Sequence, residues 1–328
     1  MIAISRIATF FPEPQLSVDS LPELAWLGES DRQTVAGFGI DTIRDGAGFS
    51  ATGLAGRATQ RLLAEIGGAA QPQAMILVGG RHPESFIASE TTQLQENAGL
   101  TNVLSISVSD LGCVSICAAL LVGKALLEAN PSWQELVIAH GSRPPGPNRV
   151  RRSVTINGDA GVALTLSRSG QSPSGHLSIM DIEIETNGKY WDLFKVDYIG
   201  QPYESWREVC TDQRKYSFVL AVESQKRFAH MNERVLRRQG LTLGDIDHFV
   251  MQNISVGAFS FYEQAFDISF ASACRENLQC YGHLGSADII VNLQRGVASG
   301  EFRNGDLILV MNNAPVAAWS TVLIEVGA

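Results

Sequence analysis

A strand, a tight glycine turn and an apolar helix follow one another in the first half of this chain. The segment 103–109, VLSISVS, has the composition of a strand, and Gly112 opens the run GCVSICAALLVGKALL at residues 112–127. A helix that is apolar on every side has to be covered by other elements. The chain is therefore expected to fold around a buried helix that directly follows a strand.

Buried strands alternate with helices over the rest of the sequence. Short apolar runs predict the strands, and apolar residues at helical spacing predict the helices between them. Strands separated by helices pair in parallel, in a sheet with helices on both faces. The main predicted strands are 1–11, 74–80, 103–109, 135–140, 162–166, 245–251, 306–311 and 318–326, and the main helices are 19–36, 51–66, 89–98, 216–238 and 285–298.

A segment rich in serine and glycine divides this pattern in two. Residues 169–190 predict a connection and an edge strand, after which the alternation of strands and helices starts again. A chain of 328 residues can form one large domain or two fused halves of about 150 residues each. We expect an α/β fold built from two weakly related βαβαβ halves, at 1–170 and 171–328.

The composition excludes several classes of protein. Hydrophobic residues make up 45% of the chain and charged residues 18%, which predicts a sizeable core and no global disorder. The net charge of −9 argues against nucleic-acid binding. No apolar window reaches the length of a membrane-spanning helix, and the N-terminal residues lack the apolar run of a signal peptide. We therefore expect neither nucleic acid nor membrane as a partner.

One of the five cysteines stands at the first turn of the apolar helix. Free N–H groups and the positive end of the helix dipole would stabilise a thiolate at Cys113 and the oxyanion of a thioester under attack. A small hydrophobic core residue is the alternative interpretation. No CxxC pair occurs among Cys113, Cys117, Cys210, Cys274 and Cys280, so we expect neither a disulfide framework nor a zinc site, and a reducing cytoplasm is the default location.

Among the six histidines, His283 is the best candidate for a base. It lies in YGHLGSA at 281–287, a glycine turn that leads into a predicted helix. A helix N-terminus disfavours the imidazolium, so we expect a neutral ring that exchanges a proton with reacting groups. A histidine that only caps the turn is the alternative.

A basic loop precedes the turn at 157–161. It contains Arg149, Arg151 and Arg152 in an otherwise acidic protein. A solvated charged loop is one interpretation, and a landing site for phosphate or for an acidic carrier is the other.

Four segments occur in the order known from one enzyme family. They are Cys113 after a strand, GDAG at 158–161, GLTLGDIDHFV at 240–250 and YGHLGSA at 281–287. In this order, and over nearly the whole chain, the sequence resembles β-ketoacyl-ACP synthase III of the thiolase superfamily. The resemblance implies a five-layered αβαβα fold, with the nucleophile in the N-terminal half and its partners in the C-terminal half. It also implies a homodimer, an acyl-enzyme on the cysteine and ping-pong transfer.

The family's catalytic residues fall on three positions of this chain. Its nucleophile falls on Cys113, its histidine on Gln252 and its asparagine on His283, so that the amide and the imidazole exchange places. A shift of one residue would put Asn253 in the histidine position. An imidazole at 283 favours deprotonation of an acceptor that attacks the acyl-cysteine, although an amide and an imidazole could also still donate to an enolate oxygen.

Other family features match less closely. The loop that supplies an oxyanion donor falls on NNAPV at 312–316, where Pro315 has no N–H, so the backbone of Ala314 or Val316 would assist that of Cys113. No Trp and Arg pair matches the family's adenine sandwich for coenzyme A, which favours a carrier-bound donor. Phe86 falls near the segment that shapes the acyl pocket across the dimer interface, with ordinary interface packing as the alternative.

Three functions are consistent with these residues. We prefer an acyltransferase that forms an acyl-Cys113 thioester from a carrier-protein or CoA thioester, in fatty-acid-like or polyketide and secondary-metabolite biosynthesis. The alternatives are decarboxylative Claisen condensation by Gln252 and His283, and a catalytically weakened subunit of a ketosynthase heterodimer. No cofactor or metal is expected beyond the phosphopantetheine that carries the acyl group. The acyl chain and the acceptor stay open.

Overall fold

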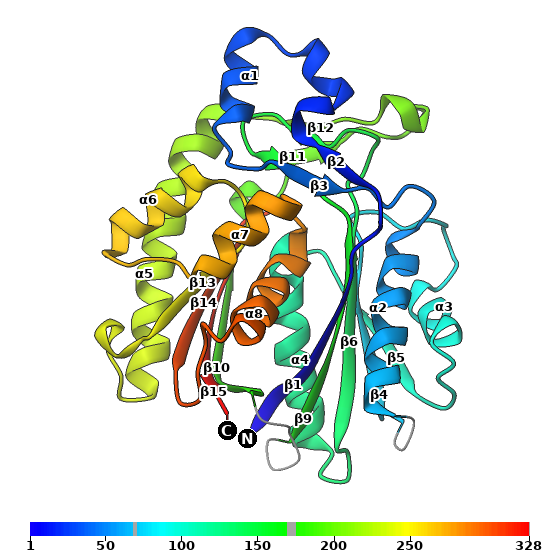
Figure 1. Ribbon diagram of the computed structural model, residues 1–328, viewed down its shortest axis with the longest axis vertical. Coiled ribbons are helices and arrows are strands. Elements are labelled where there is room, and N and C mark those ends of the chain that lie inside the picture. The colour runs from blue at the N-terminus through cyan, green and yellow to red at the C-terminus, as the bar shows by residue number, and fades with distance from the viewer. Residues whose placement is uncertain (68–70, 169–174, 328) are drawn as a thin grey trace.

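The computed structural model describes residues 1–67, 71–168 and 175–327. Within them, nine strands form one mixed sheet in the order β13-β14-β15-β10-β1-β9-β6-β4-β5 (Figure 1). These strands are β1 (Ile2–Phe10), β4 (Ala74–Val78), β5 (Leu104–Val108), β6 (Glu135–Ser142), β9 (Ala160–Arg168), β10 (Leu177–Thr186), β13 (His248–Met251), β14 (Leu307–Ala314) and β15 (Ala318–Val326).

The sheet consists of two halves with the same pairing scheme. In the first half, β4 and β6 are parallel, and β9 and β1 continue the sheet as antiparallel neighbours. In the second half, β13 and β14 are parallel, and β15 and β10 follow antiparallel. A short pairing of Ala3 and Ile4 with Ser178 and Leu177 joins the halves. The expected fold of two similar halves is confirmed, whereas the boundary between residues 170 and 171 lies outside the described residues and stays a prediction.

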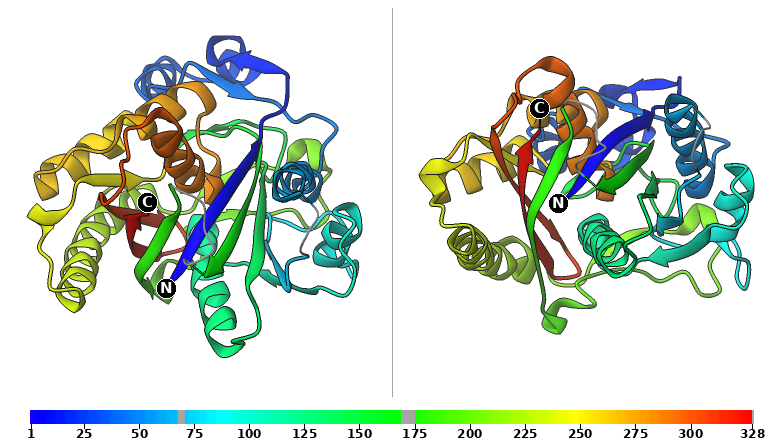
Figure 2. Two further views of the ribbon diagram at one scale, coloured as in Figure 1. Left: turned by 60° about the horizontal axis from the view of Figure 1, so that its bottom comes forward. Right: turned by 90° about the horizontal axis from the view of Figure 1, so that it is seen from below.

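The main helices lie in three layers around the two halves of the sheet (Figures 1 and 2). One outer layer contains α2 and α3, the other contains α5, and α4 and α8 lie between the halves. This is the expected five-layered αβαβα arrangement. The helices are α1 (Glu29–Ala36), α2 (Ala51–Ile66), α3 (Glu90–Asn97), α4 (Ser115–Ala129), α5 (Ala221–Arg238), α6 (Val256–Phe266), α7 (Ser272–Tyr281) and α8 (Asp288–Ser299).

Helix α4 is the buried helix that the apolar run predicts. A 3₁₀ turn, Gly112–Val114, begins it, and side chains such as Ile116 and Leu120 are at most 1% exposed. The stretch Gly112–Ala129 is long and apolar enough to cross a membrane, contrary to the expectation from the sequence. However, 56% of it is buried inside the fold, as in the core helix of a globular protein.

Three predicted elements differ from the structure. The described part of 169–190 contains β10, which pairs on both sides and is therefore an interior strand, not the predicted edge strand. The predicted helix 19–36 consists of two 3₁₀ turns and the short α1, since Pro22 and Gly28 interrupt it. The helix predicted at 216–238 begins with a π-helical turn, Lys215–Leu220, before α5.

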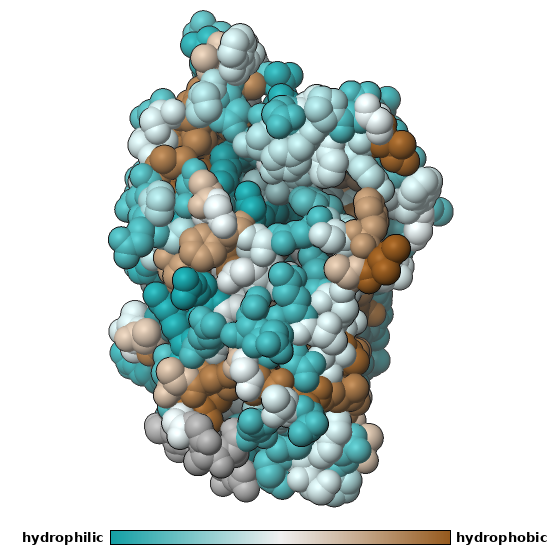
Figure 3. All heavy atoms as spheres, turned by 90° about the vertical axis from the view of Figure 1, so that its right-hand side faces the viewer, coloured by the Kyte–Doolittle hydropathy of each residue, from teal (hydrophilic) through white to brown (hydrophobic). Residues whose placement is uncertain are grey.

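Two short strands that the sequence pattern does not reveal lie near one end of the large sheet. They are β11 (Phe194–Val196) and β12 (Glu208–Cys210), which pair antiparallel and lie at the upper end of the molecule in Figure 1. This ribbon brings residues from the middle of the chain to the end of the sheet at which β5 leads into α4. The face over α2 and α3 is mostly hydrophilic, with hydrophobic side chains in separate patches (Figure 3).

Candidate active site

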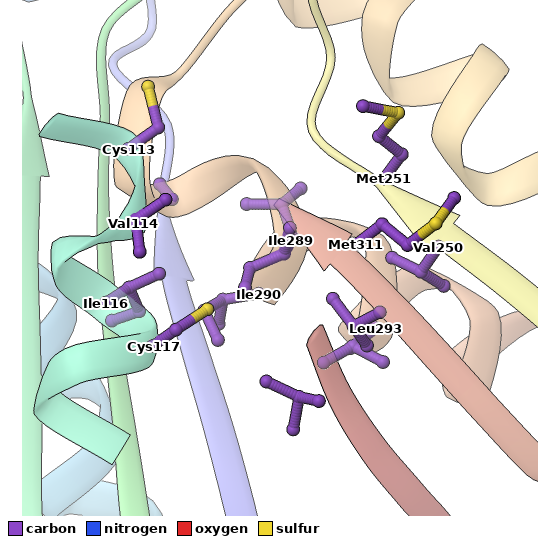
Figure 4. Packing of buried hydrophobic residues seen from close by; sticks show 14 of the residues in the cluster. Cys113, Val114, Ile116, Cys117, Val250, Met251, Ile289, Ile290, Leu293 and Met311 are labelled. Atoms are coloured by element: carbon purple, nitrogen blue, oxygen red, sulfur yellow. The ribbon is translucent and has the colours of Figure 1, made fainter. Parts of the chain in front are cut away.

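Cys113 lies on the turn that connects β5 to α4. The preceding Gly112 has a φ of 54°, and a Cβ there would lie 3.0 Å from the Cβ of Ala314. A glycine is therefore needed both for the left-handed turn and for its close approach to β14. The side chain of Cys113 is 5% exposed, and its sulfur points away from the packed side chains of Val114 and Ile116 (Figure 4).

Cys117, one turn further along α4, lies in a different environment. Its sulfur points into the hydrophobic cluster between α4 and α8 (Figure 4). Burial raises the pKa of this thiol to about 11, despite hydrogen bonds with Ser320 and Asn312. Cys117 is therefore a packing residue, as expected from the sequence.

His283 lies on the turn between α7 and α8. Its N–H donates to the carbonyl of Ile156 at 2.8 Å, and its own carbonyl accepts from the N–H of Gly158 at 3.1 Å. These bonds hold the fully buried imidazole so that its Nε2 lies 3.5 Å from the Sγ of Cys113. The structure thus brings together the thiol and the imidazole, 170 positions apart in sequence.

Asp288, the first residue of α8, completes a chain of three side chains. Its Oδ2 lies 2.6 Å from the Nδ1 of His283 and accepts the N–H of Asn253 at 3.0 Å. Its Oδ1 accepts the N–H of Leu284 at 2.7 Å. The carboxylate is fully buried, and its hydrogen bonds replace the water that it has lost. Sequence reasoning missed Asp288, although an acidic residue at the start of the helix after GHLGSA is a visible signal.

The charges of these groups stabilise one another. Burial opposes the charged imidazole, but Asp288 and Cys113 outweigh it and raise the pKa of His283 to about 9. Burial likewise opposes the Cys113 thiolate, but the charge and hydrogen bond of His283, with help from Arg81, lower the pKa of this thiol. The prediction of a neutral His283 is therefore wrong for the free enzyme, because Asp288 and Cys113 favour the charged ring.

Gln252 follows β13 and lines a cavity together with Cys113 and His283. Its Nε2 donates to the Oδ1 of Asn313 at 2.6 Å, and its Oε1 accepts the N–H of Asn313 at 3.1 Å. Asn253 is fully buried and exchanges hydrogen bonds with Asn292. It is thus Gln252, and not Asn253, whose side chain reaches the site, although hydrogen bonds to Asn313 hold the Gln252 amide in place.

Two cavities meet at Cys113. One has a volume of about 370 Å³ and is lined by apolar residues such as Trp206 together with charged residues such as Arg81 and Glu208; we call it the polar cavity, after these charged residues. The other has a volume of about 260 Å³, and apolar residues such as Leu220 and Phe261 are among those that line it; we call it the His283 cavity. Cys113, Arg151 and Pro315 line both cavities. The sulfur can therefore be approached from two sides.

The three arginines of the basic loop lie in different surroundings. Arg149 is 8% exposed and pairs with the buried carboxylate of Asp159. Arg151 is 7% exposed, and its Nε donates to Glu208 at 2.7 Å. Arg152 is exposed. The prediction that these arginines form a surface for an acidic carrier is therefore wrong for Arg149 and Arg151, because both are buried and form ion pairs inside the fold.

The other predicted site residues lie near the cavities or on the surface. Val316 lines the polar cavity, whereas Ala314 is 1% exposed and ends β14 beside the turn of Gly112. That the backbone N–H of Ala314 or Val316 donates to the oxyanion together with the N–H of Cys113 stays a prediction. Phe86 is 76% exposed and lines neither cavity of its own chain, so its contribution across a dimer interface also stays a prediction.

Sequence comparison links the chain to one family of enzymes. Residues 236–326 match the model of the C-terminal part of 3-oxoacyl-[acyl-carrier-protein] synthase III. The β-ketoacyl-[acyl-carrier-protein] synthase III of Ruegeria pomeroyi is 24% identical over 280 residues, which cover 85% of this chain and 84% of the relative. The enzyme of the same name from a Ruegeria species is 24% identical over 315 residues, or 95% of each chain.

Solved structures agree with this relationship at the level of the fold. The 3-oxoacyl-(acyl carrier protein) synthase III FabH of Pseudomonas aeruginosa has a TM-score of 0.80 and 17% identity, over 100% of this chain and 98% of that one. The acyltransferase ChlB3 has a TM-score of 0.81 and 20% identity at the same coverage. Family model, relatives and fold together show that the chain is similar to β-ketoacyl-ACP synthase III, a family of acyl-transferring enzymes, in sequence and in fold.

Proposed function

We propose that Cys113, His283 and Asp288 act as a catalytic triad that passes an acyl group from a thioester to a hydroxyl, amine or thiol acceptor. The observation that carries this proposal is the position of the imidazole, with Nε2 at 3.5 Å from the Cys113 sulfur and Nδ1 at 2.6 Å from the Asp288 carboxylate. A nucleophile, a base and a group that orients the base are the parts needed for covalent acyl transfer.

The first half-reaction loads the cysteine. The Cys113 thiolate attacks the thioester carbonyl, and the tetrahedral intermediate collapses with loss of the donor thiolate. His283 carries a proton on Nε2 at this stage, because Asp288 raises the pKa of the imidazole to about 9. That proton goes to the leaving thiolate, so acyl-Cys113 forms beside a neutral imidazole.

The second half-reaction uses the same imidazole in the opposite sense. Neutral His283 keeps its proton on Nδ1, where Asp288 accepts it at 2.6 Å, and so presents a lone pair on Nε2. This lone pair can take the proton of an acceptor as the acceptor attacks acyl-Cys113. Loss of the thiolate then releases the new ester, amide or thioester and restores the ion pair.

The same tautomer argues against decarboxylative condensation as the main reaction. An enolate oxygen needs N–H donors. Neutral His283 instead presents the lone pair of Nε2, which accepts hydrogen bonds, to the cavity. The Gln252 amide could donate, yet it is engaged with Asn313 through both its oxygen and its nitrogen. A weakened subunit is disfavoured as well, since the lowered pKa of Cys113 serves no purpose in a silent site.

The names of the relatives support an assignment of the acyl donor and of the metabolic setting. Proteins of this family are named for acyl carrier protein, so we assign a thioester of a carrier protein or of CoA as the donor. The reaction would belong to fatty-acid-like or polyketide biosynthesis in the cytoplasm, with the chain as a homodimer. No bound cofactor has a role in the triad chemistry, because the acyl group arrives already activated.

Intact-protein mass spectrometry tests the proposal. Incubation with acyl thioesters of N-acetylcysteamine should add the mass of one acyl group, and Cys113→Ala should abolish the addition. His283→Ala should slow it at least a hundredfold, as typical for loss of a general acid. His248→Ala is the matched control, because His248 pairs with Asp306 at 2.9 Å and lines neither cavity.

Discharge of the acylated enzyme distinguishes transfer to a hydroxyl or an amine from condensation with a malonyl group. Acylated enzyme mixed with small alcohols and amines should lose its acyl group to them without release of carbon dioxide. If malonyl carrier discharges the enzyme with stoichiometric carbon dioxide, condensation replaces our proposal. If no thioester labels Cys113, the triad assignment fails.

A further inference from the structure

The position of His283 determines which cavity receives the acyl group, given the proposed triad. In both half-reactions, the imidazole exchanges a proton with the donor thiol or with the acceptor. These two groups must therefore enter through the cavity that His283 lines. The acyl chain lies on the other side of the thioester carbonyl, which leaves it the polar cavity.

Cations outnumber carboxylates in the polar cavity. Four cationic side chains and two carboxylates line it, in a protein whose net charge is −9. An excess of positive charge in a cleft of an acidic protein is a local exception that selects anions. The cations are Arg81, Arg143, Arg151 and Lys195, and the carboxylates are Asp110 and Glu208.

Arg81 carries a charge that is only partly balanced and that acts on the Cys113 thiol. Its Nη1 lies 3.2 Å from Glu208, but Glu208 also accepts the Nε of Arg151 at 2.7 Å, so that one carboxylate faces two guanidinium groups. Burial and the charge of Arg151 lower the pKa of Arg81, as expected where cations lie close together. The Arg81 side chain remains 29% exposed and lines the polar cavity, which leaves part of its surface to a ligand.

A second arginine of the polar cavity has a vacant donor. Arg143 donates one Nη to the carbonyl of Phe49, but its buried Nε has no hydrogen-bond partner among the described residues. Buried polar groups are nearly always satisfied in the working state of a protein. This Nε is enclosed by the protein, so Arg81 offers the charge that a ligand can reach; an apolar acyl chain would leave that charge unpaired, whereas a carboxylate would pair with it.

We propose that the acyl group carried by Cys113 is itself anionic, the half-thioester of a short dicarboxylic acid whose free carboxylate binds in the polar cavity at Arg81. This inference rests on the proposed triad and adds the substrate class. The carboxylate takes no part in the transfer: the donor C–S bond breaks, the bond from the acyl carbon to Cys113 forms, and no carbon dioxide is lost. Arg81 thus selects the substrate, while Cys113 and His283 transform it.

Two thioesters of equal size test the charge preference. We would compare the rates at which the N-acetylcysteamine thioesters of succinic acid and of its monoamide acylate Cys113, followed by intact mass. The native enzyme should react about ten- to a hundredfold faster with the succinyl compound, as expected for a charge-assisted pair. Arg81→Met should bring the ratio close to unity, and Arg81→Lys should retain most of it.

Arg152→Met is the matched control, since Arg152 is exposed and lines neither cavity, and it should keep the native ratio. The ratio is measured within each variant, so a general loss of activity does not affect it. Should Arg81→Met not fold, the native ratio still decides. Equal or faster acylation by the monoamide would overturn the anionic substrate while leaving the triad intact, and an unchanged ratio in folded Arg81→Met would do the same. Labelling of Cys113 by other acyl thioesters but by neither of these two would also overturn the anionic substrate, whereas absence of labelling by any thioester would refute the triad itself.

Discussion

The Nδ1 of His283 lies 2.6 Å from the Oδ2 of Asp288, and both side chains are fully buried. The two residues are five positions apart, on either side of the short turn that begins α8. The N–H groups of Leu284 and Asn253 also donate to this carboxylate, in place of the solvent that burial has removed. The carboxylate orients the imidazole and raises its pKa.

Replacement of Asp288 by Asn should therefore raise the pKa of the Cys113 thiol. Asp288 itself repels the thiolate, but this influence on the Cys113 thiol is smaller than that of His283. Without the carboxylate, burial dominates and the pKa of His283 falls from about 9, so the imidazole is less often charged and stabilises the thiolate less. The rate of self-acylation, measured against pH, should have its midpoint at higher pH in Asp288→Asn. At neutral pH the rate should drop about tenfold or more.

Asp306→Asn is the control for this shift. Asp306 also pairs with a histidine, His248, at 2.9 Å, but the pair lies outside both cavities. The midpoint of Asp306→Asn should equal that of the native enzyme. An unchanged midpoint in folded Asp288→Asn would contradict the role assigned to the carboxylate.

Two cysteines on the same helix should differ strongly in reactivity. His283 lowers the pKa of Cys113, whereas burial raises that of Cys117 to about 11. Iodoacetamide at neutral pH should modify Cys113 first, with the site identified by peptide mass mapping. Since the folded pKa of Cys113 lies below that of an ordinary thiol, its alkylation rate should begin to fall only at correspondingly lower pH. Modification of Cys117 at a comparable rate would show that the two environments do not differ.

Gln252 should matter more for stability than for loading of the cysteine. Its side chain is 3% exposed and makes two hydrogen bonds to Asn313. Gln252→Ala should lower the free energy of unfolding by about 1–3 kcal/mol, because Asn313 loses its partners. Acylation of Cys113 should be slowed less than in His283→Ala. If Gln252→Ala proves as slow as His283→Ala, the amide belongs to the catalytic machinery.

Local patterns in the sequence predicted the elements well where packing and pattern agree. The helix 51–66 and the strand 318–326 have the predicted bounds, because the first has a serine N-cap and a glycine stop and the second is almost entirely buried. Strand β10 could not be placed, since its position between β1 and β15 depends on pairing with strands far away in sequence. Periodicity carries no information about which strands become neighbours.

The candidate site followed the same division. Cys113 and His283 were recognisable because each stands on a glycine turn before a helix. The charge of His283 was not, since it depends on a carboxylate that is buried only when α8 packs into the fold. The polar cavity could not be predicted from the sequence either, because Arg81 follows β4 whereas Glu208 belongs to the β11–β12 ribbon, 127 positions later.

Gly158 should be indispensable for the position of His283. A Cβ at this residue would lie 2.1 Å from the carbonyl oxygen of Tyr281, which is a backbone atom that cannot move without the turn that carries His283. Gly158→Ala should therefore displace the imidazole, and a shift of about 1 Å can reduce the rate about a hundredfold. It should also lower the free energy of unfolding by about 1–3 kcal/mol through overpacking.

Gly188→Ala provides the comparison for this last variant, because a Cβ at Gly188 meets nothing within 4 Å. Thermal unfolding and the rate of Cys113 acylation should be nearly native in Gly188→Ala and both reduced in Gly158→Ala. The two readouts separate packing from positioning. If Gly158→Ala is destabilised but still acylates at the native rate, the contact between the 156–158 segment and the His283 turn supports the fold without aligning the imidazole, and the alignment must come from Asp288 alone.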